Sequence, residues 1–96
     1  MKPVLVVGGG MITHDQILPA LYKMQRNGEV GEITVCAQHA KTVQALAAAP
    51  GILKAFPGQS FTAYPEHFAG GPQPELYKAV ISEMPERSVV IIALPD

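Results

Sequence analysis

A short apolar run that ends in three glycines constrains the fold of this chain more than any other feature. The run from Val4 to Val7 is mostly β-branched and has no alternating polar face, which is typical of a strand buried on both sides in a parallel sheet. Glycines at positions 8–10 follow it at once. From about residue 12 to residue 26 apolar positions recur at helical spacing. The sequence therefore predicts a strand, a glycine turn and a helix in succession.

The predicted first helix contains a proline and has a clear stop signal. Its apolar positions include Ile17, Leu18 and Leu21, and the dipeptide Asn27-Gly28 supplies the left-handed residue that ends many helices. Pro19 has no amide donor. The helix therefore either restarts with Pro19 in its first turn or is kinked at that residue.

The next segments predict a second β-α step. Glu32 to Ala37 has the composition of a strand, and Lys41 to Ala49 that of a short alanine-rich helix, which we expect to end at Pro50-Gly51. Residues 50–74 hold five prolines, so we expect mostly loop there, with a short strand near Ser60 to Ala63.

The last part of the chain predicts one more helix and one more strand. Pro74 is expected to open a helix with an apolar stripe that ends at Pro85, and Ser88 to Leu94 is a strongly apolar strand. Strands that alternate with helices indicate an α/β fold, in which a parallel sheet lies between two helical layers. We expect one such domain over residues 1–96, Rossmann-like in its arrangement, with strand order 3-2-1-4.

Composition excludes several classes of partner. With 48% apolar and 16% charged residues among 96, the chain has the composition of an ordinary globular domain. Its formal net charge is −1, and seven lysines and arginines are spread along it, so we expect no nucleic-acid partner. No stretch is long enough to span a bilayer or to act as a signal peptide, which favours a cytoplasmic location. The single cysteine, Cys36, allows no internal disulfide, and we expect no metal site.

The glycine turn is the strongest functional signal in the sequence. Gly8 and Gly10, followed by Thr13, occupy the positions of a Gly-x-Gly-x-x-(Gly/Ala) signature between a strand and a helix, a setting typical of dinucleotide binding. Gly8 would permit the tight turn, and Gly10 would let the backbone approach a pyrophosphate at the helix N-terminus. Thr13 departs from the pattern. The alternative is that the glycines form a tight turn without a ligand.

The end of the second predicted strand bears on the choice of cofactor. An NAD-specific site carries an acidic residue there, which binds the adenosine ribose. Here the strand ends in Cys36-Ala37-Gln38-His39, so Gln38, His39 or Lys41 would have to meet the ribose or its 2′-phosphate. This favours NADP, or the use of both cofactors.

The segment Val4 to Leu21, together with the terminal residues 89–96, resembles the amino-terminal domain of the Gfo/Idh/MocA family of oxidoreductases. The resemblance implies hydride transfer between NAD or NADP and a sugar, polyol or related compound. The family's Glu-Lys-Pro motif has no counterpart in this sequence, so no catalytic residue is assigned. Leu94 and Asp96 replace the commoner residues of the family's turn beside the cofactor. The expected cofactor-binding residues are Gly8, Gly10, Met11, Ile12, Ala37, Gln38, His39, Ala93, Leu94 and Pro95.

The last predicted strand raises the question of completeness. Ser88 to Leu94 has no charge and no proline, although strands at a sheet edge usually carry such protection. We therefore expect residues 1–96 to be the front part of a longer oxidoreductase whose substrate domain lies elsewhere, and the isolated chain to self-associate through this strand. Two other functions stay open: a dinucleotide-sensing module without enzymatic activity, and an α/β scaffold that serves only for association.

Overall fold

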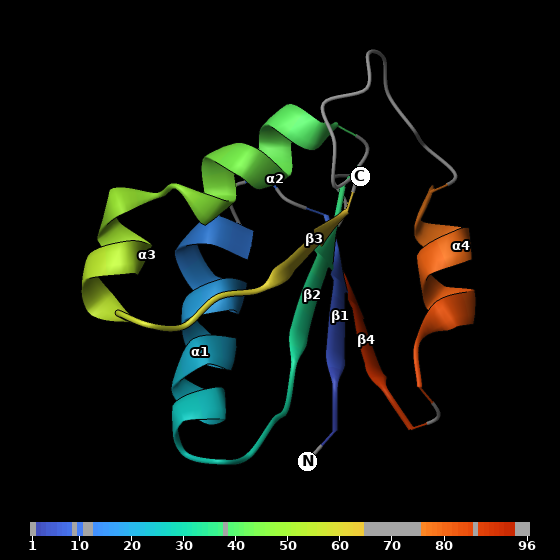
Figure 1. Ribbon diagram of the computed structural model, residues 1–96, viewed down its shortest axis with the longest axis horizontal. Coiled ribbons are helices and arrows are strands. Elements are labelled where there is room, and N and C mark those ends of the chain that lie inside the picture. The colour runs from blue at the N-terminus through green and yellow to red at the C-terminus, as the bar shows by residue number, and fades with distance from the viewer. Residues whose placement is uncertain are drawn as a thin grey trace.

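A parallel sheet forms the middle layer of the computed structural model (Figure 1). Its strands are β1 (Val4–Val7), β2 (Ile33–Cys36), β3 (Thr62–Tyr64) and β4 (Val89–Ile92), in the order β3-β2-β1-β4. All pairs are parallel, which confirms the predicted α/β class and strand order. The structure describes residues 2–8, 10, 13–37, 39–64, 76–85 and 87–93.

Helices cover both faces of the sheet. A π-helical turn, η1 (Thr13–Ile17), leads into α1 (Leu18–Arg26), and α2 (Ala40–Ala47) and α3 (Pro50–Ala55) lie on the same side as α1 (Figure 1). The remaining described helix, α4 (Leu76–Glu83), lies on the opposite face. This arrangement follows from the right-handed crossovers between parallel strands, because the direction in which successive strands are added reverses between β3 and β4.

Strand β1 separates two apolar cores. Val4 and Val6 face α1, α2 and α3, whereas Leu5 and Val7 face α4. All four residues of β1 are at most 3% exposed. The prediction of a strand buried on both faces is therefore confirmed for β1, and β2 is buried in the same way.

The proline in the first helix lies where a π-helical turn passes into α1. Pro19 lies in the first turn of α1, where a missing amide costs nothing, and η1 precedes it. Ile17, between the two segments, has helical backbone angles, so the chain passes from the π-helical turn into α1 without leaving the helix and Pro19 falls in the first α-helical turn. The helix ends as expected, because Gly28 has a φ of 78° and its amide, with that of Glu29, donates to the carbonyls of Gln25 and Met24.

Helix α3 corrects the prediction for residues 50–55. Pro50-Gly51 was expected to end a helix and to begin a loop, but Pro50 instead opens α3, with Ala49 as its N-cap. Proline is unfavourable inside a helix but favourable in its first turn, so Pro50 is compatible both with the end of one helix and with the start of the next. The segment after α3 packs on α1: the Phe56 ring lies 5.5 Å from that of Tyr22, and the Arg26 guanidinium lies 4.9 Å from the Phe56 centroid.

Strand β4 is an edge strand of the described sheet, and three of its four side chains are exposed. Val89 and Val90 are each 40% exposed and Ile92 is 65% exposed, whereas Ile91 packs against the core on the α1 side. An apolar edge with free backbone donors and acceptors is a ready template for another strand. Two copies of one such strand can pair about a two-fold axis, because the contact is then self-complementary.

We expect the chain to self-associate through β4, and Ile92→Lys to weaken that association. Burial of one isoleucine side chain in a strand-to-strand contact contributes about 1.5–3 kcal/mol to the free energy of association, and the substitution removes this contribution. The two lysines would also repel each other across the two-fold axis. Sedimentation velocity over a concentration series measures the effect. Leu53→Lys is the matched control, because Leu53 is 50% exposed on α3, away from the edge. A chain that stays monomeric at all concentrations, or equal effects of both substitutions, would contradict the expectation.

Candidate functional site

The carboxyl ends of the strands meet at one edge of the sheet, where all four arrowheads point in Figure 1. Backbone hydrogen bonds continue the sheet one residue past the strands: Ala37 donates to Tyr64 over 3.0 Å, Gly8 to Cys36 over 2.7 Å, and Ala93 to Val7 over 2.8 Å. Three of the predicted cofactor-binding residues, Gly8, Ala37 and Ala93, are thereby held in register along this edge.

Gly8 and Gly10 differ in what their backbones require. Gly8 is buried and has a φ of 121°, a conformation that residues with a side chain rarely adopt, so the chain leaves β1 through a turn that needs glycine there. Gly10 is exposed, and a Cβ atom built on it would meet nothing within 4 Å. Space next to the Gly10 backbone is therefore open on the side where a side chain would stand.

Thr13 closes the glycine turn. It is fully buried, and its hydroxyl donates a hydrogen bond of 2.7 Å to the carbonyl of Gly8. A glycine or alanine at this third position of the signature has no such donor. The departure from the pattern therefore supplies a tie between the start of η1 and the end of β1, a role that the sequence pattern did not reveal.

The described residues between β2 and α2 include no aspartate or glutamate. Ala37 is half-buried, and the exposed His39 is the N-cap residue of α2, whose carbonyl accepts a hydrogen bond of 3.1 Å from the Thr42 amide. Lys41 is exposed in the first turn of α2. Lys41 thus places a cationic side chain at the second residue of α2.

Half of the predicted cofactor-binding residues lie in the part of the chain that the structure describes. Gly8, Gly10, Ala37, His39 and Ala93 are described, and all of them lie at or next to the carboxyl edge of the sheet. The other predicted residues lie outside the described ranges: Met11, Ile12, Gln38, Leu94 and Pro95.

A hollow of about 450 Å³ adjoins the glycine turn. Gly10 and His14 border it on one side, and Thr42, Ala45 and Ala49 border it from α2 and the residues after that helix. Its walls are mostly apolar, which suits the body of an organic ligand better than a bare ion. Sequence reasoning missed the α2 residues, although the small side chains at positions 42 and 45 share one helical face.

The titratable pair next to the turn is partly exposed to solvent. His14 Nδ1 lies 2.6 Å from the Asp15 carboxylate, but both side chains are about half exposed, so this pair contributes little to stability. His14 is thereby a polar, half-exposed residue of η1. In the described ranges, histidine, cysteine, aspartate and glutamate nowhere gather in groups of three that would hold a metal ion. The helices of these ranges are too short or too polar to span a bilayer.

The chain matches no protein-family model, no curated protein and no solved structure in the comparisons.

Proposed function

We propose that this chain is the dinucleotide-binding part of an NAD(P)-dependent oxidoreductase similar to the Gfo/Idh/MocA family. The observation that carries the proposal is the position of the glycine turn in the sheet. The turn follows β1, and β1 lies between β2 and β4. In open α/β sheets, ligands bind outside the carboxyl ends of the strands, where the order of strands reverses.

Two features of the described part of the turn support pyrophosphate binding. The open space beside Gly10 allows a close approach to the backbone, and η1 with α1 begins just beyond it. Amides at the start of a helix point outward and carry partial positive charge, which favours an anion. Thr13 supports this role indirectly, because its bond to Gly8 fixes where the helix begins relative to β1.

The corner at the end of β2 supports binding of the adenosine ribose with a 2′-phosphate. Ala37 and His39 offer no carboxylate to accept bonds from a free 2′-hydroxyl. The exposed Lys41 and the first amides of α2 instead offer positive charge. We therefore propose NADP, or both cofactors, as the ligand.

A bound nicotinamide cofactor would supply the hydride, and this chain would bind and orient the cofactor. Gly10 would admit the pyrophosphate, Ala37 and His39 would border the ribose, and Ala93 at the end of β4 would lie on the nicotinamide side of the crevice. Acid, base and substrate-binding residues would come from a further part of the enzyme, and the substrate would be a sugar, polyol or related compound.

Gly10→Ala should weaken dinucleotide binding without unfolding the chain. A methyl group there meets no protein atom, but it would fill the space that a pyrophosphate needs, at a cost of roughly tenfold to hundredfold in affinity. Titration of NADPH and NADH, followed by calorimetry or by nicotinamide fluorescence, measures the effect, and NADPH should bind at least as tightly as NADH.

Gly51→Ala is the matched control, because a Cβ at Gly51 also meets nothing within 4 Å and this residue lies in α3. Circular dichroism on both variants verifies that the fold is kept. Absence of saturable binding to the unsubstituted chain would favour the scaffold function instead. Equal losses in both variants would show that the glycine turn does not contact the ligand.

A further inference from the structure

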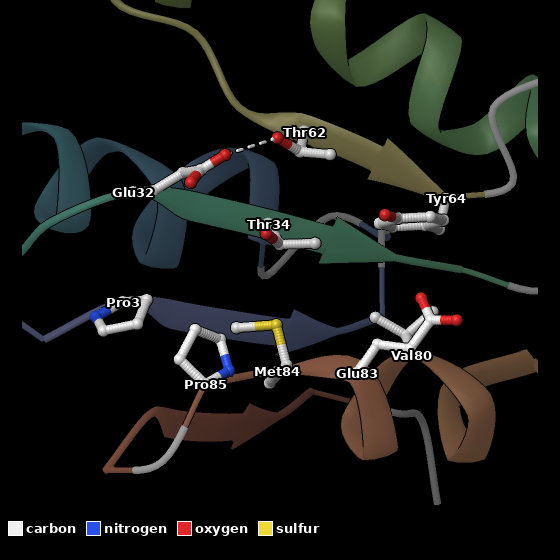
Figure 2. A pocket seen from close by; sticks show the side chains of 9 residues that line it. All are labelled: Pro3, Glu32, Thr34, Thr62, Tyr64, Val80, Glu83, Met84 and Pro85. Carbon is white, nitrogen blue, oxygen red and sulfur yellow. Dashed lines mark hydrogen bonds between the residues drawn. The ribbon is translucent and has the colours of Figure 1, made fainter.

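A second cavity lies on the other side of the sheet, between the strands and α4 (Figure 2). Its volume is about 410 Å³, within the range of small-molecule sites. Pro3 and Glu32, which directly precede β1 and β2, border it, as do Glu83 and Met84 at the end of α4. The glycine turn contributes no described residue to its lining.

The sheet presents hydroxyl groups to this cavity. Thr34 pairs with Leu5 on one side and with Thr62 on the other, so all three side chains share the face that α4 covers. Tyr64, two residues beyond Thr62, lies on the same face and also lines the cavity. Figure 2 shows these polar side chains along one wall.

Two carboxylates stand on opposite walls. Glu32 belongs to the sheet side, where its Oε1 accepts a hydrogen bond of 3.0 Å from the Thr62 hydroxyl. Glu83 belongs to the last turn of α4. Lysine and arginine are absent from the described lining residues, so the charged groups of this described lining are both acidic.

Thr34 is the most deeply buried polar residue of the β2 wall of this cavity. It is only 6% exposed, and within the described part of the chain its hydroxyl has no hydrogen-bond partner. No side-chain oxygen or nitrogen there is both sealed from solvent and unpartnered, so the Thr34 hydroxyl keeps access to the cavity that it lines. Water in the cavity can reach this hydroxyl, and a ligand that displaces that water has to offer the hydroxyl a hydrogen bond in its place.

We propose that this cavity binds a small organic ammonium cation. Carboxylates at Glu32 and Glu83 would meet the positive charge, and the hydroxyl of Thr34 would accept a hydrogen bond from the ammonium group. Val80, Met84 and Pro85 provide an apolar wall for an alkyl stem, and the Tyr64 ring adds an aromatic surface of the kind that attracts cations.

Other ligand classes fit the lining less well. An anion would meet two carboxylates and no described cationic side chain. A bare divalent metal ion is stabilised by clustered carboxylate, histidine or cysteine ligands, and in the described ranges no group of three such side chains lies together. An uncharged apolar molecule would leave the Thr34 hydroxyl without a partner.

The test uses three four-carbon probes that differ in charge. Butane-1,4-diamine should bind saturably, butylamine more weakly, and the uncharged butane-1,4-diol not measurably, with NMR shifts of residues around the cavity as the readout. Affinity for the diamine should fall as salt is added, because exposed charge pairs are screened. Absence of saturable binding of the diamine, or equal binding of the diol, would overturn the proposal.

Isosteric variants locate the site. Glu32→Gln and Glu83→Gln should each weaken diamine binding roughly twofold to fivefold, as expected for partly exposed ion pairs. Thr34→Val keeps the shape of the side chain and removes the hydroxyl, and should weaken binding roughly threefold to tenfold. Glu29→Gln is the matched control, because Glu29 is exposed and does not line the cavity. Backbone amide spectra verify that each variant is folded, and losses no larger than that of the control would overturn the proposal.

The proposal stands apart from the proposed dinucleotide site. It uses side chains on the α4 face of the sheet and none of the residues of the glycine turn. Failure of diamine binding would therefore leave the dinucleotide proposal untouched, and failure of NADPH binding would leave this one untouched.

Discussion

Leu5→Ala should lower the free energy of unfolding by about 2–5 kcal/mol, the range for truncation of a buried leucine. Leu5 is fully buried between β1 and α4, in a cluster with Val7, Cys36 and Val80. This cluster is the smaller of the two cores, so few neighbours are available to close the space that the substitution leaves. Because single domains are stable by only about 5–15 kcal/mol, the loss would take a large share of the total.

Urea unfolding followed by circular dichroism measures this loss. Leu53→Ala is the matched control, since it makes the same chemical change at a residue that is half exposed on α3, and it should change stability by no more than about 0.5 kcal/mol. Similar losses in both variants would show that α4 does not hold a core against β1.

The regular part of the fold could be predicted because each signal is local. A β-branched run followed by glycines has few alternatives to a buried strand and a turn, and Asn27-Gly28 ends α1 through the left-handed geometry that glycine permits. Strand β4 was recognised by its composition, and its place beside β1 followed from the usual order of such sheets.

Helix α3 could not be predicted because its signal is ambiguous and its support is tertiary. Pro50 fits the end of one helix or the start of another, and six residues are too few to form a stable helix alone. The segment is held by contacts with α1. The Arg26 guanidinium donates to the Ala55 carbonyl, and the side-chain amide of Gln59 donates to the Tyr22 carbonyl. Neither contact can be read from residues 50–59 in isolation.

The two sites differ in the same way. Gly8 and Gly10 are adjacent to the strand and helix that they connect, so their place in the fold follows from their place in the sequence. The cavity between the sheet and α4 is assembled from residues before β1 and β2, from β2 and β3, and from α4 and the two residues after it, which lie up to 82 positions apart in the chain. Thr34 could not be predicted as a cavity residue from the sequence, because threonine is common in strands and only the position of α4 shows that it lines a cavity.

Cys36 should react with thiol reagents far more slowly in the folded chain than in the unfolded one. It is 1% exposed, and burial raises the pKa of its thiol from 9.0 to about 11. Reagents attack the thiolate, whose fraction near neutral pH falls roughly tenfold for each unit by which the pKa rises. We therefore expect labelling at pH 8 to be at least about 100-fold slower in buffer than in denaturing urea.

The raised pKa also fixes the sign of a pH effect on stability. The unfolded thiol loses its proton at a lower pH than the folded one, so the stability that this group contributes is present below pH 9 and is lost as the pH rises from 9.0 to about 11. Cys36→Ala should remove this contribution to the alkaline loss of stability, which urea unfolding between pH 8 and 10.5 would detect. An unchanged alkaline profile would contradict the assignment.

Cys36 labelling and Leu5→Ala should be linked, because both residues belong to the cluster under α4. When opening and closing are fast relative to labelling, the labelling rate follows the population of the open chain. A loss of 2–5 kcal/mol then raises the rate roughly 30-fold to several thousand-fold. Leu53→Ala should leave the rate nearly unchanged. Fast labelling of the unsubstituted chain, with its circular dichroism intact, would instead show that α4 opens over Cys36 without global unfolding.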